Sequence, residues 1–213
     1  SLGTALRAFD RGGDVFYEQI SALHKSVRGS DPDAAIYWFA RMIDGGCDPM
    51  YVGRRLVRMA SEDLGNADPR ALTVAVDACA AFERLGSPEG ELALVQSCIY
   101  LATAPKSNAA YNAYKEARRQ AQKTGSLSPP KHILNAPTKL MKEQGYGKGY
   151  AYDHDAEDGF SGQNYFPDGV PRPDLYQPVE RGFEREVKKR LDYWDKLRRE
   201  REGAGLRASA NFS

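Results

Sequence analysis

Residues 65–105, GNADPRALTVAVDACAAFERLGSPEGELALVQSCIYLATAP, contain two apolar segments separated by Gly86 and Pro88. Both segments repeat apolar side chains at helical spacing. The first segment carries large apolar residues at Leu72, Val76, Cys79 and Phe82 and small ones at Ala71, Ala75 and Ala78. The second segment has two apolar stripes. One consists of Leu92, Val95, Ile99 and Ala102, and the other of Leu94, Cys98 and Leu101. A helix that is apolar on both sides is typical of the centre of a fold. We therefore expect a buried helical hairpin here.

The first half of the chain repeats one signal for the start of a helix. An Asp or Ser stands directly before a proline at positions 31, 48, 68 and 87, and a glycine precedes each pair. The Asp or Ser side chain caps a helix N-terminus, proline suits the first helical position, and glycine tolerates the left-handed conformation that ends the preceding helix. With a start near Asp14 and a further helix from about Ser107 to Lys123, this predicts about six helices in 14–124. Short loops favour an all-α, antiparallel bundle or array.

The character of the chain changes after Gly125. Seven prolines and many glycines between 125 and 178 exclude long regular elements, apart from one short helix over Thr138–Gln144. Because this stretch is rich in aromatic side chains, we expect it to wrap over a surface rather than to be disordered. A last helix is predicted over 179–202, followed by a flexible tail over 203–213.

Composition places the chain among ordinary globular proteins, with 41% hydrophobic and 28% charged residues and a formal net charge of +1. It has no apolar run long enough for a membrane span and no apolar signal segment. The three cysteines, Cys47, Cys79 and Cys98, show no CxxC spacing. We therefore expect neither a disulfide framework nor a zinc site, no membrane partner, and a cytoplasmic location.

The sequence carries no recognisable catalytic motif. The glycine-rich string at 145–149 lacks the spacing and the hydroxyl of a nucleotide-binding loop, and the three histidines have no partners at metal-ligand spacing. The acidic loop 153–158 lacks the calcium-binding pattern and is better explained as a solvated loop. We expect no catalytic residue, no cofactor and no metal in this chain, although a nucleophile and base brought together only by folding would escape this search.

The net charge hides alternating blocks, of which the basic block 106–150 is the strongest functional lead. It has nine Lys or Arg against two acidic residues, whereas 151–180 has one against seven. The residues that could contact DNA are Lys115, Arg118, Arg119, Lys123, Lys139, Lys142 and Lys148. Cationic side chains neutralise phosphates, and interleaved tyrosines can stack on unpaired bases. The alternative is a solvated face that the following acidic block covers.

Several long strings resemble the RarA/MgsA family of AAA+ ATPases, which is related to the Werner-helicase-interacting ATPases. They are YEQISALHKSVRGSDPDAAIYWFARMIDGG (17–46), RRLVRMASEDLGNADPRAL (54–72), ERLGSPEGELALVQSCIYLATAPKSNAAY (83–111) and NAPTKLMKEQGYGKGYAY (135–152). The order of the strings is also that of the family, and the likeness covers roughly residues 5–200. It includes a late segment containing Asn164, Tyr165, Pro167, Tyr176, Gln177, Pro178, Arg181 and Gly182.

The resemblance implies that this chain is the C-terminal part of a DNA-dependent ATPase. Residues 1–13 would then end the ATPase lid, and ATP and Mg²⁺ would bind to a preceding domain. The rest would resemble the clamp-loader collar and assemble a homo-oligomer, most simply a tetramer. The parent would act in replication, recombination and repair at stalled forks, on DNA and with single-stranded-DNA-binding protein, in association with the nucleoid.

Two hypotheses for this chain follow. In the first it is an oligomerisation module, since aromatic side chains bury large areas at interfaces. The residues expected at the subunit interface are Tyr146, Tyr150, Tyr152, Phe160, Tyr165, Phe166, Tyr176, Phe183 and Trp194. In the second it is a DNA-binding module that contacts single strands or DNA ends through the basic block.

Overall fold

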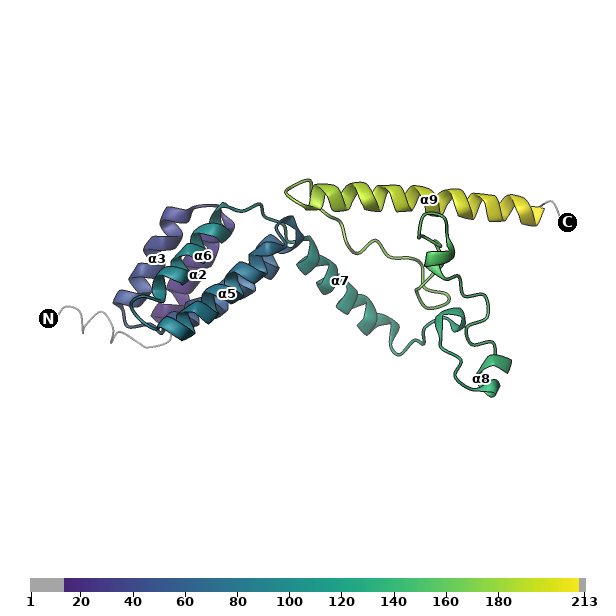
Figure 1. Cartoon of the computed structure of the whole chain (residues 1–213), viewed down its shortest axis with the longest axis horizontal. Coiled ribbons are helices and arrows are strands. Elements are labelled where there is room, and N and C mark those ends of the chain that lie inside the picture. Colours follow the sequence, from purple (N-terminus) through teal and green to yellow (C-terminus); the bar gives the residue numbers. More distant parts are fainter. Residues whose placement is uncertain (1–13, 211–213) are drawn as a thin grey trace. The chain divides into compact units, whose positions relative to one another are not determined.

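The computed structural model describes residues 14–210, and these residues contain helices and loops but no strand (Figure 1). The α-helices are α2 (Asp14–Arg28), α3 (Pro32–Asp44), α4 (Pro49–Met59), α5 (Arg70–Leu85), α6 (Glu91–Thr103), α7 (Ala109–Thr124), α8 (Lys139–Glu143) and α9 (Glu184–Ala210). Short helical turns are η1 (Ala60–Leu64), η2 (Gly65–Ala67), η3 (Lys131–Ile133) and η4 (Asp153–Asp155). The predicted all-α class is confirmed. None of the described helices is both long and apolar enough to cross a membrane.

The predicted capping residues explain where α3 and α4 begin. Asp31 accepts a hydrogen bond from the backbone N–H of Ala34, and Asp48 accepts one from Met50. In both helices proline follows the cap. The start predicted from Ser87-Pro88 is wrong, because α6 begins at Glu91, three residues after Pro88. A turn over residues 87–90 separates that proline from the helix.

The chain divides into two compact units, and the division does not follow the predicted boundary at 125. Unit 1 comprises the described residues up to Tyr114 together with Tyr176–Arg185, and unit 2 comprises Lys115–Leu175 with the described residues from Glu186 onward. The boundary passes within α7 and near the start of α9. The last helix also begins later than predicted and continues to Ala210, so the predicted tail 203–213 is helical as far as it is described.

Unit 1 is a bundle around one hydrophobic core. Helix α2 packs on α3, α5 packs on α6, and α6 also contacts α2, α3 and α4, which places it at the centre (Figure 1). Three large side chains of α6 and α4, Leu94, Leu101 and Leu56, have no exposed surface. Val52 and Met59 of α4 are fully buried as well.

The predicted core hairpin is buried on one side only. Leu94, Cys98 and Leu101 of α6 and the alanines of α5 face the core. The exposed fractions of four large residues that were expected to be buried are 43% for Leu72, 48% for Val76, 71% for Leu92 and 38% for Ile99. The alanines let α5 and α6 approach closely, so the larger residues beside them are directed outward.

Unit 2 has little apolar core and is organised around one aromatic ring. Phe160 stacks on Trp194 of α9 at a centroid distance of 6.4 Å, and the guanidinium carbons of Arg198 and Arg201 both lie 5.3 Å from the centre of the Phe160 ring. Arg201 also forms an ion pair with Asp158 at 2.8 Å. Cation–π contacts and an ion pair, in which Arg201 Nη2 contacts both oxygens of Asp158, therefore hold loop 158–162 on α9.

Candidate functional site

The most concentrated polar cluster of unit 1 forms where α4 ends. The helix continues into η1, a π-helical turn of five residues, and such wider turns frequently occur at functional sites. Asp63 lies in this turn with 5% of its surface exposed. Its carboxylate is held from α2 by two side chains, since His24 Nε2 lies 2.6 Å from Asp63 Oδ2 and Arg28 Nε donates to Asp63 Oδ1 at 2.7 Å.

The neighbouring Glu62 belongs to the same network. It accepts a hydrogen bond from Arg58 at 2.9 Å, and its other oxygen lies 3.6 Å from Arg28. On the far side of the imidazole, Arg55 lies 3.5 Å from His24 Nδ1. When Nε2 carries a hydrogen, it donates to Asp63 and leaves Nδ1 to accept from Arg55, while Arg28 Nη2 lies 3.1 Å from the same Nε2 atom. We call His24, Arg28, Glu62 and Asp63 the carboxylate cluster.

The carboxylate cluster has ligand atoms at metal-binding distances but does not suit a metal ion. Nitrogen and oxygen atoms of His24, Glu62 and Asp63 all lie within 4.8 Å of one another. However, the Arg28 guanidinium already contacts all three side chains. A metal ion placed there would have to displace the Arg28 guanidinium, which contacts both the Asp63 and the Glu62 carboxylates. The geometry therefore fits a structural ion-pair network.

Electrostatics agree with this assignment. Burial alone raises the pKa of Asp63, but the hydrogen bonds from His24 and Arg28 outweigh burial and hold that pKa below its usual value. The hydrogen bond to Asp63 raises the pKa of Arg28 in turn. Both groups are therefore charged at neutral pH, and neither is tuned for proton transfer.

The connection between α6 and α7 is anchored to the same turn. The backbone N–H of Ser107 donates to the Asp63 carbonyl at 2.8 Å. The Lys106 ammonium group donates to the carbonyl oxygens of Ala102 and Ala104 at the end of α6, and burial lowers its pKa. Lys106 thus stabilises the C-terminus of α6, where carbonyl groups lack partners within the helix.

A returning segment completes this side of unit 1, and we call Tyr176–Arg185 the strap. Phe183 N–H donates to the Ala67 carbonyl at 2.8 Å. Gly182 has φ 54°, and a Cβ atom there would collide with the same carbonyl, so glycine is required. Within the strap, Glu184 is fully buried and accepts a hydrogen bond from Val179 N–H. These contacts fix the backbone beside Arg181.

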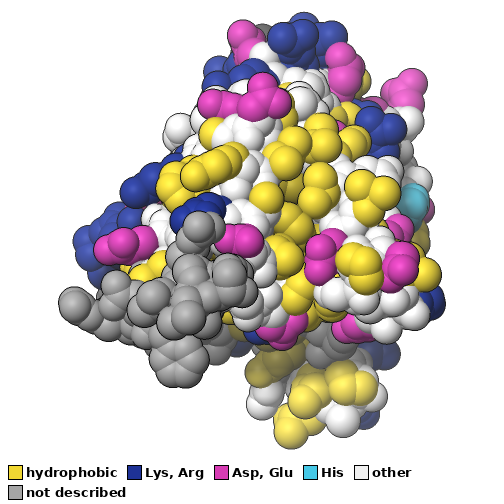
Figure 2. Space-filling model, turned by 90° about the vertical axis from the view of Figure 1, so that its left-hand side faces the viewer, with side chains coloured by type: hydrophobic (Ala, Val, Ile, Leu, Met, Phe, Trp, Pro, Cys, Tyr) yellow, Lys and Arg dark blue, Asp and Glu magenta, His cyan; other side chains and the backbone are white. Residues whose placement is uncertain are grey.

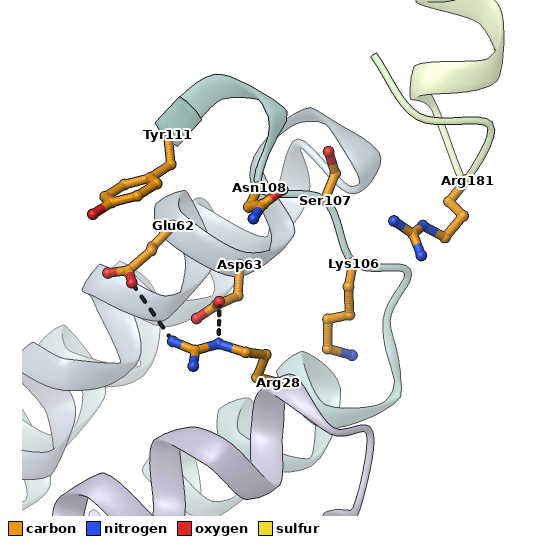
Figure 3. Close-up of a pocket in the computed structure, with 8 residues that line it drawn as sticks. All are labelled: Arg28, Glu62, Asp63, Lys106, Ser107, Asn108, Tyr111 and Arg181. Atoms are coloured by element: carbon orange, nitrogen blue, oxygen red, sulfur yellow. Dashed lines mark hydrogen bonds and ion pairs between the residues drawn. The ribbon is translucent and has the colours of Figure 1, made fainter. Parts of the chain in front are cut away.

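The strap and the α6–α7 connection enclose a pocket of about 400 Å³ next to the carboxylate cluster. Figure 3 shows the Arg28 guanidinium directed at Glu62 and Asp63, whereas Lys106 and Arg181 lie on the other side of the pocket and Arg181 reaches in from the strap. Asn108 and Tyr111, from the beginning of α7, complete the lining. The pocket thus combines three cationic side chains with polar groups from distant parts of the sequence.

A second feature is the outer face of α6. Leu92, Val95 and Ile99 follow one another at helical spacing, and Leu92 and Ile99 are exposed. Beside them a groove runs between α5 and α6, lined by three alanines, Ala78, Ala81 and Ala93, and by Val74, Asp77, Gln96 and Ser97. Ser97 is 1% exposed, and its hydroxyl has no hydrogen-bond partner within the described part of the chain. Buried polar groups normally have a partner. We call this strip with its groove the α6 face.

Apolar side chains reach the surface elsewhere on unit 1. The end of this unit that faces the viewer in Figure 2 shows hydrophobic side chains bordered by charged ones. Exposed large residues of the unit include Tyr17 and Tyr37. Single exposed apolar residues are normal, whereas contiguous ones mark interaction surfaces. The regular spacing on α6 is what separates the α6 face from scattered exposure.

All seven cationic residues predicted to contact DNA belong to unit 2 and are exposed. Lys115, Arg118, Arg119 and Lys123 lie on α7, Lys139 and Lys142 on α8, and Lys148 on the turn that follows α8. Arg119 forms an ion pair with Glu116, and Lys139 lies 3.9 Å from Glu143. Exposed ion pairs of this kind are weak and leave both cations accessible.

The aromatic residues predicted at the subunit interface divide between the units. Tyr176 and Phe183 belong to the strap, and the other seven, Tyr146, Tyr150, Tyr152, Phe160, Tyr165, Phe166 and Trp194, belong to unit 2. Phe160 is half-buried in the contacts described above, and Tyr165 donates a hydrogen bond to Asp153. Tyr150 and Tyr152 are 48% and 54% exposed. Tyr152 is the most exposed of the set, and Tyr150 and Tyr165 follow with 48% each.

The acidic loop is organised by its own hydrogen bonds. Asp153 accepts from Ser161 N–H at 2.7 Å and from the Tyr165 hydroxyl at 2.8 Å. These bonds lower the pKa of Asp153 to about 2. Asp158 is paired with Arg201, as noted above. Two of the loop's carboxylates therefore stabilise unit 2 itself.

Comparison with known proteins identifies the origin of this fold. Residues 29–195 match the family described as MgsA AAA+ ATPase C terminal. The chain belongs to this family. It is 57% identical to Replication-associated recombination protein A of Coxiella burnetii over 92% of the chain and 45% of that protein. It is 53% identical to the Escherichia coli K12 protein of the same name over 86% of the chain and 41% of that protein.

The MgsA C-terminal family extends to eukaryotes. The chain is 46% identical to ATPase WRNIP1 of Dictyostelium discoideum over 79% of the chain and 19% of that protein. The family relationship predicted from the sequence strings is therefore confirmed. The chain spans less than half the length of these relatives, so it corresponds to the C-terminal domain of an AAA+ ATPase and not to the whole enzyme.

Sequence reasoning missed the carboxylate cluster and the pocket. Metal-ligand spacing gives His24 no partner, because its carboxylate partner Asp63 lies 39 positions further along the chain. The available signal was the string SEDLGNADP, in which two adjacent acids follow a helix rich in arginine. Periodicity predicts one continuous helix there, because it cannot register the extra residue that a π-helical turn accommodates.

Proposed function

We propose that this domain is the self-association module of its parent ATPase, acting in replication-associated recombination. The observation that supports the proposal is the α6 face, where Leu92 and Ile99 remain exposed on the central helix of unit 1. Burying such a strip removes apolar surface from water at about 25 cal/mol per Å². The neighbouring groove would admit side chains of a second copy, and Ser97 would gain a hydrogen-bond partner.

The test is the mass of the chain in solution. Multi-angle light scattering of the 23.6 kDa chain should give a multiple of that mass, four copies being the simplest expectation. The double variant Leu92→Glu, Ile99→Glu should yield monomers that keep their helical circular dichroism. The matched control is Leu127→Glu, Leu140→Glu, which places the same charges on exposed leucines of unit 2 and should leave the mass unchanged.

A monomer at all concentrations would contradict self-association. If the α6 variant instead stays oligomeric, the predicted aromatic interface becomes the explanation. The double variant Tyr150→Ser, Tyr152→Ser tests that alternative, because both side chains are exposed and, within the described residues, the only ring contact of either joins Tyr152 to the nearby His154.

A second candidate function is contact with single-stranded DNA or DNA ends through the basic block. It is favoured by the exposure of all seven predicted cations, together with Tyr111 and Tyr114 of α7, which are 48% and 68% exposed. Fluorescence anisotropy should detect salt-sensitive binding of a labelled single strand. The triple variant Arg118→Gln, Arg119→Gln, Lys123→Gln should flatten the log–log salt dependence by about 0.7 for each phosphate that is no longer neutralised.

The two functions are compatible, because self-association would repeat a weak DNA-binding surface and raise avidity. In this proposal ATP and Mg²⁺ bind outside the chain, in the ATPase domain of the parent. Single-stranded-DNA-binding protein is proposed as a partner of that parent. Absence of anisotropy change at low salt would rule out direct DNA binding by this domain and leave self-association untouched.

A further inference from the structure

The pocket between the strap and the start of α7 has more cationic groups than its carboxylates can neutralise. Its two acids, Glu62 and Asp63, contact two arginines and a histidine, and a third arginine lies on the far side of that histidine. Lys106 and Arg181 add two further charges on the opposite side. The cations that line the pocket are Arg28, Lys106 and Arg181, three against the two carboxylates, and Arg55 and Arg58 contact the carboxylate cluster from outside the pocket. The surplus favours an anion.

The hydrogen-bonding groups point to the same conclusion. The two carboxylates of the pocket are already engaged, Asp63 by His24 and Arg28 and Glu62 by Arg58. By contrast, the Arg181 guanidinium, the Asn108 amide and the Tyr111 hydroxyl line the pocket and make no hydrogen bond or ion pair within the part of the chain that the structure describes. A ligand that matches this lining must bring acceptors and negative charge.

The position of Arg181 is fixed by the fold. Its neighbour Gly182 lies against the Ala67 carbonyl, and the Phe183 N–H donates to that carbonyl. The buried Glu184 holds the other part of the strap through Val179. The Arg181 backbone is therefore held at the rim, with its side chain directed inward (Figure 3). The fixed backbone thus brings an exposed guanidinium to the pocket, and a guanidinium can bind a tetrahedral oxyanion through paired hydrogen bonds.

We propose that this pocket binds a phosphate group, with Arg181 and Asn108 as the principal contacts. Phosphate offers several acceptors in a compact anion, and guanidinium binds it through paired hydrogen bonds. Lys106 contributes charge at short range while its hydrogens remain on the end of α6. Tyr111 donates from the opposite rim. The phosphate group can come from a free phosphorylated compound or from a nucleic-acid backbone, since both present the same oxygens.

The site is separate from the α6 face and from the seven exposed cations of the basic block. It lies in unit 1, whereas those cations belong to unit 2. The proposal therefore does not depend on the α6 face or on those seven cations, although Lys106, Asn108 and Tyr111 of the pocket lie at the start of the basic block.

The test is titration of the ¹⁵N-labelled chain with inorganic phosphate at constant ionic strength. We expect chemical-shift changes at the backbone amides of Asn108–Tyr111 and at Gly182, together with the Arg181 side-chain Nε–H signal. Arg181→Gln should weaken this binding by about tenfold, the usual cost of one charge-assisted hydrogen bond. Arg84→Gln removes the same charge from an exposed position on α5 and should change nothing.

Two further titrations identify the source of the phosphate. A short single-stranded oligonucleotide that shifts the same amides supports a nucleic-acid backbone, and shifts with inorganic phosphate alone support a free phosphorylated compound. Equal shifts with sodium chloride at matched ionic strength would overturn the proposal, because they would report only screening. Unchanged spectra with both phosphate probes, or equal affinity in Arg181→Gln and wild type, would also overturn it.

Discussion

The two units of this domain are stabilised in different ways. Unit 1 holds the hydrophobic core cluster, in which side chains such as Ile20, Leu56 and Leu101 are inaccessible to water. Unit 2 relies on stacking, cation–π contacts and hydrogen bonds between loops and α9. One chain therefore combines a cooperative hydrophobic core with a segment whose order depends on a few polar and aromatic contacts.

The largest effect should come from creating a cavity in the core of unit 1. Leu101→Ala removes a fully buried side chain of the central helix, and such changes cost about 2–5 kcal/mol. Urea denaturation followed by circular dichroism measures the loss. Leu140→Ala, at a leucine that is 63% exposed in unit 2, is the control and should cost less than about 0.5 kcal/mol. Equal losses in the two variants would contradict the contrast between the units.

The next effect concerns the pH dependence of unit 1. Because the pKa of Asp63 is lower in the folded state than in the unfolded chain, its contribution to stability is complete above about pH 4 and is lost as pH falls through the folded pKa. Asp63→Asn should lower stability at pH 7 by about 2 kcal/mol, since Arg28 loses a charged partner. The variant should also lose less stability on acidification than wild type does.

Urea midpoints between pH 7 and pH 2 provide this measurement. The control is Glu18→Gln, at an exposed residue of α2, which should reproduce the wild-type profile. An unchanged acid limb in Asp63→Asn would show that the carboxylate cluster does not set the acid stability of unit 1.

In unit 2 the sharpest probe is the ring at its centre. Phe160→Ala removes the stack on Trp194 and both cation–π contacts, a loss of about 1–2 kcal/mol that we expect to remain local. Hydrogen exchange should accelerate in residues 153–165 and along α9 from Glu186. Amides of α5 and α6 should exchange at wild-type rates. Acceleration in unit 1 would mean that the two units unfold as one.

The smallest change in stability should come from removing the N-cap side chain of a helix, and the two units can be compared in this way. Asp31 caps α3 in unit 1, and Thr138 caps α8 in unit 2 by accepting from Met141 N–H. Asp31→Ala should lower the global stability of unit 1 by about 1 kcal/mol. Thr138→Ala should only accelerate exchange of the five residues of α8, because so short a helix contributes little to cooperative unfolding. A global loss from Thr138→Ala would place α8 within the cooperative core.

By itself the sequence determined the helical class, the starts of α3 and α4, and the family. Capping and proline effects act within a few residues, so Asp31 and Asp48 reveal them directly, and long matching strings reveal ancestry. The same local rules predicted the short helix α8 and excluded long elements around it. Charge counting also located the exposed cations of the basic block, because charged side chains rarely lie inside a protein.

Only the tertiary structure decided which apolar stripe of α6 faces the core and which residues surround the pocket. Helical periodicity predicted that Leu92 and Leu101 would both be buried. In the structure only Leu101 is buried, because the alanines of α5 let that helix pack closely against one side of α6. The carboxylate cluster joins residues 24 and 63, and the pocket adds residue 181 from the strap. Contacts between segments so far apart depend on how the helices pack, which no local pattern encodes.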